Sequence, residues 1–338
     1  MHSVTPSKNS PLQTETQAVP EQHAGQRLDR VLAELWPGVS RTRWKATIQS
    51  GKVLRNGEVS RKPNLPVEEG DQLQVEMPAQ QVAKAPSGDP ITELVVLHED
   101  EELVVIDKPA GLIVHANDRF QSGTLADLVA ARYGVLPAVQ GAHRRGIVHR
   151  LDRLTSGVIL IGRTERAQQK LKEQFQERTV AKSYTAFVYG VPRFQSDWIE
   201  TGVAPDPRHM GRYRSISAET DLNTVEGGRT ASTYYEVKET FNGFAELECR
   251  PKSGRTHQIR VHMTSIGMPL IGDSIYRHRG ARPVELPDTV SLPGRHALHA
   301  SSISFEHPVS GERVCYEAPL SADLVALREG LRKHAPKA

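Results

Sequence analysis

The first recurring apolar pattern along the chain has helical spacing. Apolar side chains occupy positions i, i+3, i+4 and i+7 of one stripe, at Leu28, Val31, Leu32 and Leu35. This pattern is typical of an amphipathic helix. Pro37-Gly38 should end it. Ser40 is placed to cap a second helix, in which Trp44 and Ile48 face one way and which Gly51 should end.

Short strands are predicted after these two helices. Val53-Leu54 precedes Asn56-Gly57, a dipeptide that favours a tight hairpin turn. A further strand should begin after Gly70-Asp71, with alternating apolar side chains at Leu73, Val75 and Met77. Residues 23–78 are therefore predicted to form a small α/β domain.

The rest of the chain combines many strands with few helices. Apolar strands are predicted at residues 94–97, 103–106, 158–161, 232–237 and 245–249. The four consecutive apolar residues that start at Val158 predict burial on both faces. A surface helix should carry Ala167, Leu171 and Phe175 on one face, with Thr164 as its cap. Because the order is not a regular βαβ alternation, we expect an α+β fold with a mixed, largely antiparallel sheet.

Composition suggests where the domains begin and end. Residues 1–22 are rich in Ser, Thr, Pro and Gln and are expected to form a disordered tail. Residues 79–92 show no periodicity and are expected to form a linker. The larger domain should occupy residues 93–325, and residues 326–338 should form a C-terminal tail.

Composition also narrows the kind of protein. The sequence has no run of about 18 apolar residues that could span a membrane, and it does not start with a signal-peptide pattern. Its two cysteines, Cys249 and Cys315, give neither a disulfide framework nor metal-ligand spacing. We expect a monomer in the reducing cytoplasm, without a membrane partner.

Basic residues concentrate in the small domain. Residues 24–63 contain nine basic and three acidic side chains, a local charge of +6, whereas the whole chain has a net charge of +3. This asymmetry favours a polyanion as partner, and a solvated basic surface is the alternative. The side chains expected to contact the polyanion are Arg27, Arg41, Arg43, Lys45, Lys52 and Arg55.

One segment places a carboxylate between arginines. Asp152 is flanked by Arg150 and Arg153 in a predicted loop between apolar strands, and Thr155-Ser156-Gly157 permits a tight turn after it. Nearby cations lower the pKa of a carboxyl group. Asp152 would then be ionised at neutral pH and ready to act as a nucleophile or a base. A structural salt bridge is the other interpretation.

A second polar segment spans residues 252–262. If it is a strand, Arg260 and His262 point one way, toward a cleft or a nucleic-acid surface, and Ile259 points the other way. His257 and His262 lack a nearby cysteine and the register of a metal site on one face. We therefore expect hydrogen-bonded structural histidines and no metal.

A third segment, residues 182–190, is predicted to be an alternating strand. Tyr184, Ala186 and Val188 would share one of its faces. A tyrosine at the edge of a pocket can stack on a nucleic-acid base. A tyrosine that simply packs within the sheet is the alternative.

Together, these segments resemble the RluA/RluD family of RNA pseudouridine synthases. The resemblance covers about residues 93–320 and rests on blocks in the family's order. They are Asp107-Lys108-Pro109-Ala110-Gly111-Leu112, His149-Arg150-Leu151-Asp152 with Thr155-Ser156-Gly157, Lys182-x-Tyr184 with Gly190, residues 253–262, residues 269–273 and residues 297–300. Two small departures are Ser253, where threonine is commoner, and Arg153-Leu154, where a charged pair is commoner.

The N-terminal segment is similar to the RNA-binding domain named after ribosomal protein S-four. The similarity rests on Arg27-Leu28-Asp29, Ser40-Arg41, Gly51-x-Val53, Asn56-Gly57 and Gly70-Asp71. Many members of the RluA/RluD family carry this module in front. The local charge of +6, which was counted independently, agrees with an RNA partner.

The resemblance implies a pseudouridine synthase fold and an enzyme that isomerises uridine to pseudouridine in structured RNA. Large-subunit ribosomal RNA is favoured as substrate because the N-terminal module and the lead-in Gly146-Ile147-Val148 resemble the RluD branch, and transfer RNA is the alternative. The reaction gains no atoms, so no cofactor is expected.

The resemblance also implies roles for individual residues. Asp152 would be the essential carboxylate, acting as a nucleophile or as a base, and Arg255 would pair with it. Tyr184 would stack on the target base and is a candidate base for the last proton removal. The substrate-binding candidates are His149, Arg150, which would fill the gap left by a flipped-out uridine, Ile259, an apolar wall, and Arg260.

Two other functions were considered. A catalytically silent RNA-binding protein is disfavoured because Asp152, Tyr184 and Arg255 are all present. A glycosidase-like hydrolase would use two carboxylates, and we expect no second acid to work beside Asp152.

Overall fold

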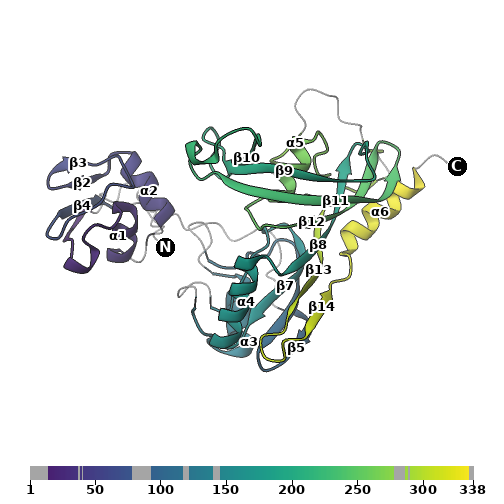
Figure 1. Ribbon diagram of the computed structural model, residues 1–338, viewed down its shortest axis with the longest axis horizontal. Helices are drawn as coiled ribbons and strands as arrows, with labels where there is room; N and C mark the ends of the chain where they lie inside the picture. The colour runs from purple at the N-terminus through teal and green to yellow at the C-terminus, as the bar shows by residue number, and fades with distance from the viewer. Residues whose placement is uncertain are drawn as a thin grey trace, which may run out of the picture. The chain divides into compact units, whose positions relative to one another are not determined.

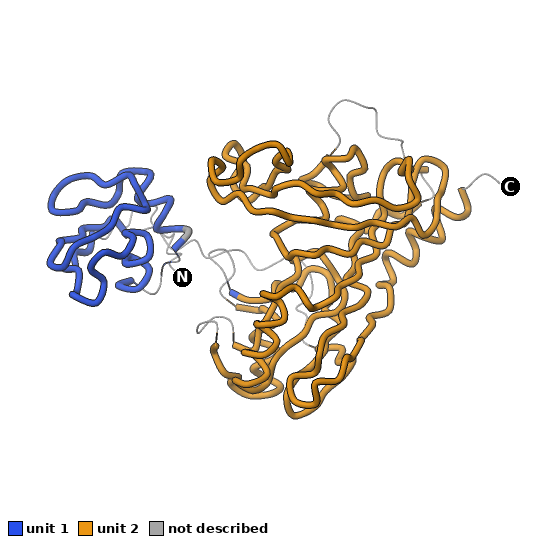
Figure 2. The backbone as a smooth tube through the Cα atoms, in the orientation of Figure 1, with its two compact units in different colours: residues 1–85, 116–121 blue, residues 86–115, 122–338 orange. Residues whose placement is uncertain are grey.

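The computed structural model describes residues 14–36, 39, 41–77, 93–116, 122–139, 145–277, 286–287 and 290–334. The chain forms two compact units (Figure 2). One contains residues 1–85 and 116–121, and the other contains residues 86–115 and 122–338. Each unit has its own hydrophobic core. Within the described residues, no helix is long and apolar enough to cross a membrane.

The smaller unit combines two helices with a four-stranded antiparallel sheet (Figure 1). The strands are β1 (Thr14–Ala18), β2 (Val53–Arg55), β3 (Glu58–Val59) and β4 (Gln72–Glu76), and their order is β1-β4-β2-β3. The helical elements are η1 (Glu21–His23), α1 (Leu28–Leu35) and α2 (Arg41–Gln49).

The sequence pattern explains this unit well. In the apolar stripe of α1, Leu28, Val31 and Leu32 are buried and Leu35 is half-buried. The centre of the Trp36 ring, which follows the helix, lies 5.7 Å from that of the Trp44 ring on α2. Asn56 and Gly57 have φ angles of 52° and 83° between β2 and β3. Positive values at both positions are what a two-residue hairpin turn requires, so the predicted turn is confirmed.

The prediction of a disordered tail over residues 1–22 is wrong for its last part. Thr14–Ala18 pairs with Gln72–Glu76 along its whole length, and Val19 is buried in the core. The composition is misleading because β1 is an edge strand of mostly polar side chains, held by backbone hydrogen bonds to β4. Pro37-Gly38, Ser40 and the predicted linker lie outside the described residues.

The larger unit is built on a ten-stranded sheet (Figure 1). Its strands are β5 (Val95–Glu99), β6 (Leu103–Lys108), β7 (Ser156–Gly162), β8 (Ala181–Tyr189), β9 (Ser196–Pro205), β10 (Tyr213–Ile216), β11 (Arg229–Phe241), β12 (Phe244–Pro251), β13 (Leu298–Glu306) and β14 (Arg313–Glu317). The order is β10-β9-β11-β12-β8-β13-β7-β6-β5, and β14 also pairs with β13. Among the described strands only β7 and β13 pair in parallel, which confirms the mixed, largely antiparallel sheet.

Helices cover parts of this sheet. They are α3 (Leu125–Tyr133), α4 (Glu165–Glu177), α5 (Gln258–Ser265) and α6 (Ala322–Lys333), and η3 (Leu222–Thr224) is a single 3-10 turn. Figure 1 shows α3 and α4 near β7 and α5 near β10. The backbone N–H of Ala167 donates to the hydroxyl of Thr164 at 3.0 Å, so the predicted cap of α4 is confirmed. Every residue of β7 is buried, as its apolar run predicts.

Three local predictions for this unit are wrong. The C-terminal tail was expected from residue 326, but α6 continues to Lys333 and buries Leu327 and Leu331. The expected turn at Thr155-Ser156-Gly157 lies earlier, at Arg153-Leu154, because Ser156 already belongs to β7. The strand expected within residues 252–262 is instead the short helix α5, whose polar side chains are buried together with its apolar ones. Because polar and apolar residues of this segment are buried alike, their order along the sequence does not reveal the helical period.

Candidate active site

Asp152 lies in the loop that leads into β7, and hydrogen bonds hold the backbone carbonyls of Asp152 and of the residue after it. The N–H of Thr155 donates to the Asp152 carbonyl at 3.1 Å, and the N–H of Gly111 donates to the Arg153 carbonyl at 2.8 Å. The fully buried ammonium of Lys108 also donates to the Arg153 carbonyl, at 3.2 Å, and to two carbonyls of its own segment. The early Lys-Pro-x-Gly block thus holds the loop that carries the carboxylate.

The side chain of Asp152 pairs with an arginine from α5. Nη1 of Arg260 donates to Oδ2 of Asp152 at 3.1 Å. The Nε and Nη2 atoms of the same guanidinium donate to the two carboxylate oxygens of Asp273 at 2.7 and 2.9 Å. The Arg260 side chain is 5% exposed and that of Asp273 is 0% exposed. A bidentate pair of this kind fixes the guanidinium plane, and it therefore fixes the N–H group that reaches Asp152.

The electrostatic surroundings keep Asp152 ionised. Burial alone would raise the pKa of this carboxyl, but His257, Arg260 and His296 outweigh burial and hold the pKa below its usual value. Burial lowers the pKa of His296 to about 3, so that imidazole is neutral at pH 7. Arg260 is therefore the permanent cation beside Asp152. The predicted direction of the pKa is confirmed, although the cations are not the flanking arginines.

The predicted pairing of Arg255 with Asp152 is wrong. Nε of Arg255 donates to the Thr230 carbonyl at 3.3 Å, and Arg260 makes the ion pair instead. The difference follows from the local structure, because α5 begins at Gln258 and turns Arg260 inward, whereas Arg255 precedes the helix. Arg255 still lines the pocket that contains Asp152.

This pocket lies between the Asp152 loop, β8 and the segment that leads into α5. Its lining residues are Arg150, Leu151, Asp152, Thr155, Tyr184, Pro251, Ser253, Gly254, Arg255, Thr256, His257, Gln258, Ile259, Arg260 and Leu298. The structure therefore brings Asp152 together with Tyr184, Arg255, Ile259, Arg150 and Arg260. Ile259 is 5% exposed and supplies an apolar wall, as expected.

Tyr184 packs against two hydrophobic cores and also lines the pocket. Its neighbours on the same face of β8, Ala186 and Val188, belong to one of these cores, so the predicted alternation is confirmed. Burial raises the pKa of the Tyr184 phenol, and the nearby Asp152 anion raises it further. The phenol is therefore neutral at pH 7, which disfavours a role as a preformed base.

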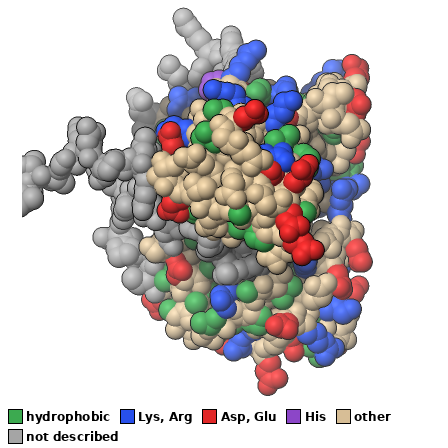
Figure 3. Space-filling model, turned by 90° about the vertical axis from the view of Figure 1, so that its left-hand side faces the viewer, with side chains coloured by type: hydrophobic (Ala, Val, Ile, Leu, Met, Phe, Trp, Pro, Cys, Tyr) green, Lys and Arg blue, Asp and Glu red, His purple; other side chains and the backbone are tan. Residues whose placement is uncertain are grey.

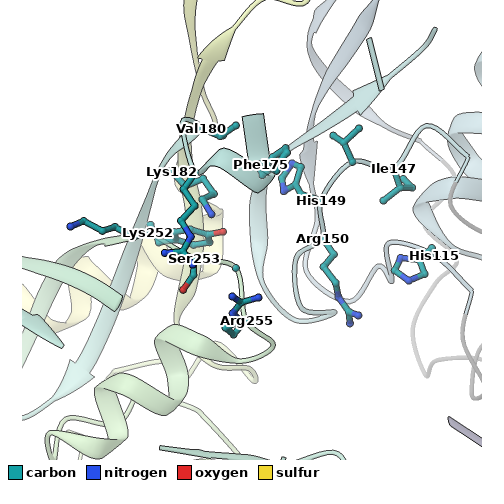
Figure 4. A pocket seen from close by; sticks show the side chains of 14 residues that line it. His115, Ile147, His149, Arg150, Phe175, Val180, Lys182, Lys252, Ser253 and Arg255 are labelled. Atoms are coloured by element: carbon teal, nitrogen blue, oxygen red, sulfur yellow. The ribbon is translucent and has the colours of Figure 1, made fainter. Parts of the chain in front are cut away.

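His149 and Arg150 differ in their surroundings although they are neighbours. The backbone N–H of Leu160 donates to Nε2 of His149 at 2.9 Å, and the ring stacks on Phe175 with centroids 4.8 Å apart (Figure 4). Burial, aided by Lys182, lowers the pKa of His149 to about 3. His149 therefore has a structural contact to β7 besides any role with substrate. Arg150 is exposed at the rim.

Sequence analysis missed several polar residues of the site. Nδ1 of His257 is hydrogen-bonded to the Tyr276 hydroxyl at 2.8 Å, and its Nε2 lies 3.8 Å from Asp152. His296 is hydrogen-bonded to the Thr155 hydroxyl at 2.9 Å. Asp273 is a second acid in the network, which was not expected. Its carboxylate is occupied by Arg260 and by backbone N–H groups, so it is not available as a proton donor. The contacts of His257 with Asp152 and of His296 with Thr155 join segments more than a hundred residues apart, which spacing does not reveal.

The basic side chains predicted to contact RNA lie in the smaller unit, and several are paired internally. Arg27 and Arg41 both donate to Asp29, Lys52 lies 3.2 Å from Glu76, and Arg55 pairs with Asp71. The predicted contact residues Arg43 and Lys45 lie on α2 of the same unit. On the face shown in Figure 3, basic and acidic side chains are interspersed.

The fold and the site define a class of protein. It is an enzyme with one ionised carboxylate in a cationic pocket, and it carries a separate basic domain. Comparison with known families agrees. The family model described as RNA pseudouridylate synthase matches residues 102–265, and the S-four domain model matches residues 26–73.

Individual relatives extend the match over most of the chain. The "Ribosomal large subunit pseudouridine synthase D" of Xanthomonas campestris pv. campestris is 40% identical over 95% of this chain and 93% of its own. The protein of the same name from Pseudomonas aeruginosa is 38% identical over 93% and 95%, respectively. The chain belongs to the RNA pseudouridine synthase family.

A solved structure supports the fold. The human protein "RNA Pseudouridylate Synthase Domain Containing 4" is 24% identical, with a TM-score of 0.55 over 70% of this chain and 93% of that one. At this identity the likeness concerns the fold, and it places the ten-stranded sheet among pseudouridine synthase folds.

Proposed function

We propose that this enzyme converts specific uridines of large-subunit ribosomal RNA to pseudouridine, with Asp152 as the catalytic carboxylate. The main support is the difference in hydrogen bonding between the two carboxylate oxygen atoms of Asp152. Oδ2 accepts from Arg260, whereas no hydrogen bond between described residues reaches Oδ1. The side chain is 18% exposed and lines the pocket. An oriented anion with one unoccupied oxygen suits nucleophilic attack and proton abstraction alike.

Isomerisation requires the bond between the uracil nitrogen and the ribose to break and a new bond to form at carbon 5 of the same base. Asp152 acts on the ribose, either by bonding to it or by removing one of its protons, and Arg260 keeps the carboxylate ionised before that step and stabilises it again when it is released. The proton lost from carbon 5 is balanced by a proton gained at the nitrogen that was bonded to the ribose, so there is no net gain or loss of atoms. The protein therefore contributes by positioning the substrate and by supplying charge, and the reaction needs no co-reactant.

The walls of the pocket suit a detached uracil ring. Tyr184 offers an aromatic face and Ile259 an apolar one, a pair that can hold a planar base by stacking and van der Waals contact. A neutral Tyr184 phenol can also donate a hydrogen bond to the base. We assign the final removal of the proton from carbon 5 to a group other than a tyrosinate.

A uridine within a helix cannot reach this pocket, so the target is flipped out or already unpaired. Arg150 is exposed at the rim of the pocket and is our candidate to fill the gap left in the RNA. The S-four domain would hold the surrounding RNA. We further propose that the enzyme acts in the cytoplasm as a monomer.

The test is to map pseudouridines in total RNA from strains with and without this gene by chemical labelling. The deletion strain should lack specific sites in large-subunit ribosomal RNA. A plasmid copy of the wild-type gene should restore them, and the Asp152→Asn variant should not. Loss of sites only in transfer RNA would contradict the proposed substrate, and unchanged maps would contradict the activity.

A further inference from the structure

A second pocket adjoins the one that contains Asp152. It has a volume of about 300 Å³, and the two share Arg150, Tyr184, Ser253, Gly254 and Arg255 in their linings. The second pocket extends along β8 to Lys182 and to the end of α4 (Figure 4). A polymer that places one nucleotide beside Asp152 would therefore enter this pocket with the adjoining part of its backbone.

Lys182 is the unusual residue here. It lies two positions before Tyr184 on β8, so the two side chains project from the same face of the strand. Among the residues that the structure describes, the side chain of Lys182 makes no hydrogen bond or ion pair. Its ammonium lies 6.0 Å from the centre of the Phe175 ring. Burial lowers its pKa to about 8. Lys182 is half-buried, and partial desolvation of an ammonium without a counter-ion has a cost that no contact with the described residues offsets.

The other charges around the pocket have the same sign. Arg150, Arg178 and Arg255 line it together with Lys182, and its described lining contains no carboxylate. Burial lowers the pKa of Arg255, and the nearby Arg178 and Arg229 add to this effect. Lys252 also lines the pocket. Its side chain points away from Arg150 and His149 (Figure 4), and its ammonium lies 4.1 Å from the centre of the Trp198 ring. These cations repel one another, and a bound anion would offset that repulsion.

We propose that this pocket is a binding site for a phosphate group of the RNA backbone adjoining the target uridine, with Lys182 as its principal ligand and Arg150, Arg178 and Arg255 around it. The inference rests on the proposed function for its substrate. RNA is the source of the phosphate because the pocket opens into the one beside Asp152, so a bound nucleotide carries its own phosphate into it. Phosphate contacts fix the position of a nucleic acid without reading its sequence. Lys182 is thus a positioning residue that sets which nucleotide stands over Asp152.

The first experiment measures RNA binding across a salt series, with large-subunit ribosomal RNA from a strain that lacks this gene. All proteins carry Asp152→Asn, so that no product forms. Adding Lys182→Met should weaken binding and reduce the log–log salt slope by about 0.7–0.9, the change expected for one lost phosphate contact. Lys170→Met is the matched control, because Lys170 is exposed on the outer face of α4 and lines none of the described pockets. It should leave affinity and slope unchanged.

The second experiment locates the contact. Once a target uridine is mapped, a synthetic RNA fragment carries an uncharged methylphosphonate linkage on its 5′ or its 3′ side. One of the two should weaken binding to the Asp152→Asn protein and have no further effect when Lys182→Met is also present. Additive losses would show that Lys182 and that phosphate do not interact.

Folding is monitored in the same variants. Lys182→Met removes an unpaired, half-buried charge, so its melting temperature should equal or exceed that of the parent protein. A lower melting temperature would indicate a structural partner and overturn the proposal, as would an unchanged salt slope. If no pseudouridine forms even with Asp152 intact but the slope falls as expected, the phosphate site stands and the proposed function fails.

Discussion

Replacing Arg260 with lysine tests the central contact of the site. The guanidinium makes three hydrogen bonds to two carboxylates, two to Asp273 and one to Asp152. An ammonium group keeps the charge but cannot occupy both positions in this geometry. Asp273 is wholly buried, so a lysine at this position should stay with Asp273 and leave Asp152 without its partner.

The size of the effect follows from the contact that is lost. A hydrogen bond to a charged group contributes about 1.5–3 kcal/mol, and each 1.4 kcal/mol corresponds to a factor of about ten. Arg260→Lys should therefore lower kcat about ten- to a hundredfold. The free energy of unfolding should fall by less than the about 3–5 kcal/mol that follows full removal of one partner from a buried ion pair, because the charge beside Asp273 remains.

The pH profile separates loss of orientation from loss of folding. The cations around Asp152 hold its pKa below the usual value, and the carboxylate must be ionised to act. Activity is therefore lost as the pH falls through this lowered pKa, and weakening the Arg260 contact should move the acid limb of kcat/KM to higher pH. The stability that ionised Asp152 contributes changes over the same pH range. It is fully present above the pKa of Asp152 in the unfolded protein and is lost as the pH falls through the lower pKa in the folded protein.

The assay is release of tritium from carbon 5 of labelled uridine in RNA, measured from about pH 2.5 to 8 so that the acid limb falls within the range, with thermal unfolding in parallel. Arg328→Lys is the matched control, because Arg328 on α6 makes a similar bidentate pair with Glu246 far along the sheet. It should alter stability alone. Wild-type kcat and an unshifted acid limb in Arg260→Lys would refute the assignment of Arg260 to Asp152.

Three further outcomes are expected. Asp152→Asn should bind RNA normally and release less than a tenth of the tritium, because an amide cannot supply the anionic oxygen; turnover nearer to wild type would contradict its role. Gly157→Ala should destabilise the protein by several kcal/mol in denaturant unfolding, since its Cβ would lie 2.2 Å from the Ala300 carbonyl oxygen; Gly311→Ala, also at positive φ but facing open space, should cost only about 1–2 kcal/mol. A protein that starts near Ala85 should keep activity on short unpaired RNA but bind natural RNA more weakly and with a shallower salt slope; equal slopes would show that the removed module does not contact RNA.

Sequence patterns correctly predicted those helices and strands whose buried positions are occupied by apolar residues. The stripe of α1, the apolar run of β7 and the alternation of β8 belong to this class, because each pattern repeats with the period of the element. β1 and α5 were missed for the opposite reason. The pairing of β1 depends on a partner strand more than fifty residues away in the sequence, and α5 buries polar side chains whose partners come from other elements.

The site shows the same division. Asp152 and Tyr184 were identified through a resemblance that preserves residue type and order. The arginine was misassigned because two arginines, Arg255 and Arg260, stand five residues apart in one block, and only the start of α5 decides which one points inward. His257 was anticipated only as a structural histidine and His296 was not anticipated, since nothing in their spacing brings them to a carboxylate in another segment.

The second acid clarifies why this carboxylate can be reactive. If Asp152 held Arg260 alone, the guanidinium could satisfy both of its oxygens and leave neither for substrate. Asp273 takes two of the donors instead and is itself held by the N–H groups of Ile275 and Tyr276. One N–H of Nη1 donates to Asp152, which is enough to keep it charged and oriented. Removing the charge of Asp273, as in Asp273→Asn, should therefore release Arg260 to bind Asp152 more fully, and a lower kcat with a well-folded protein would be the sign of it.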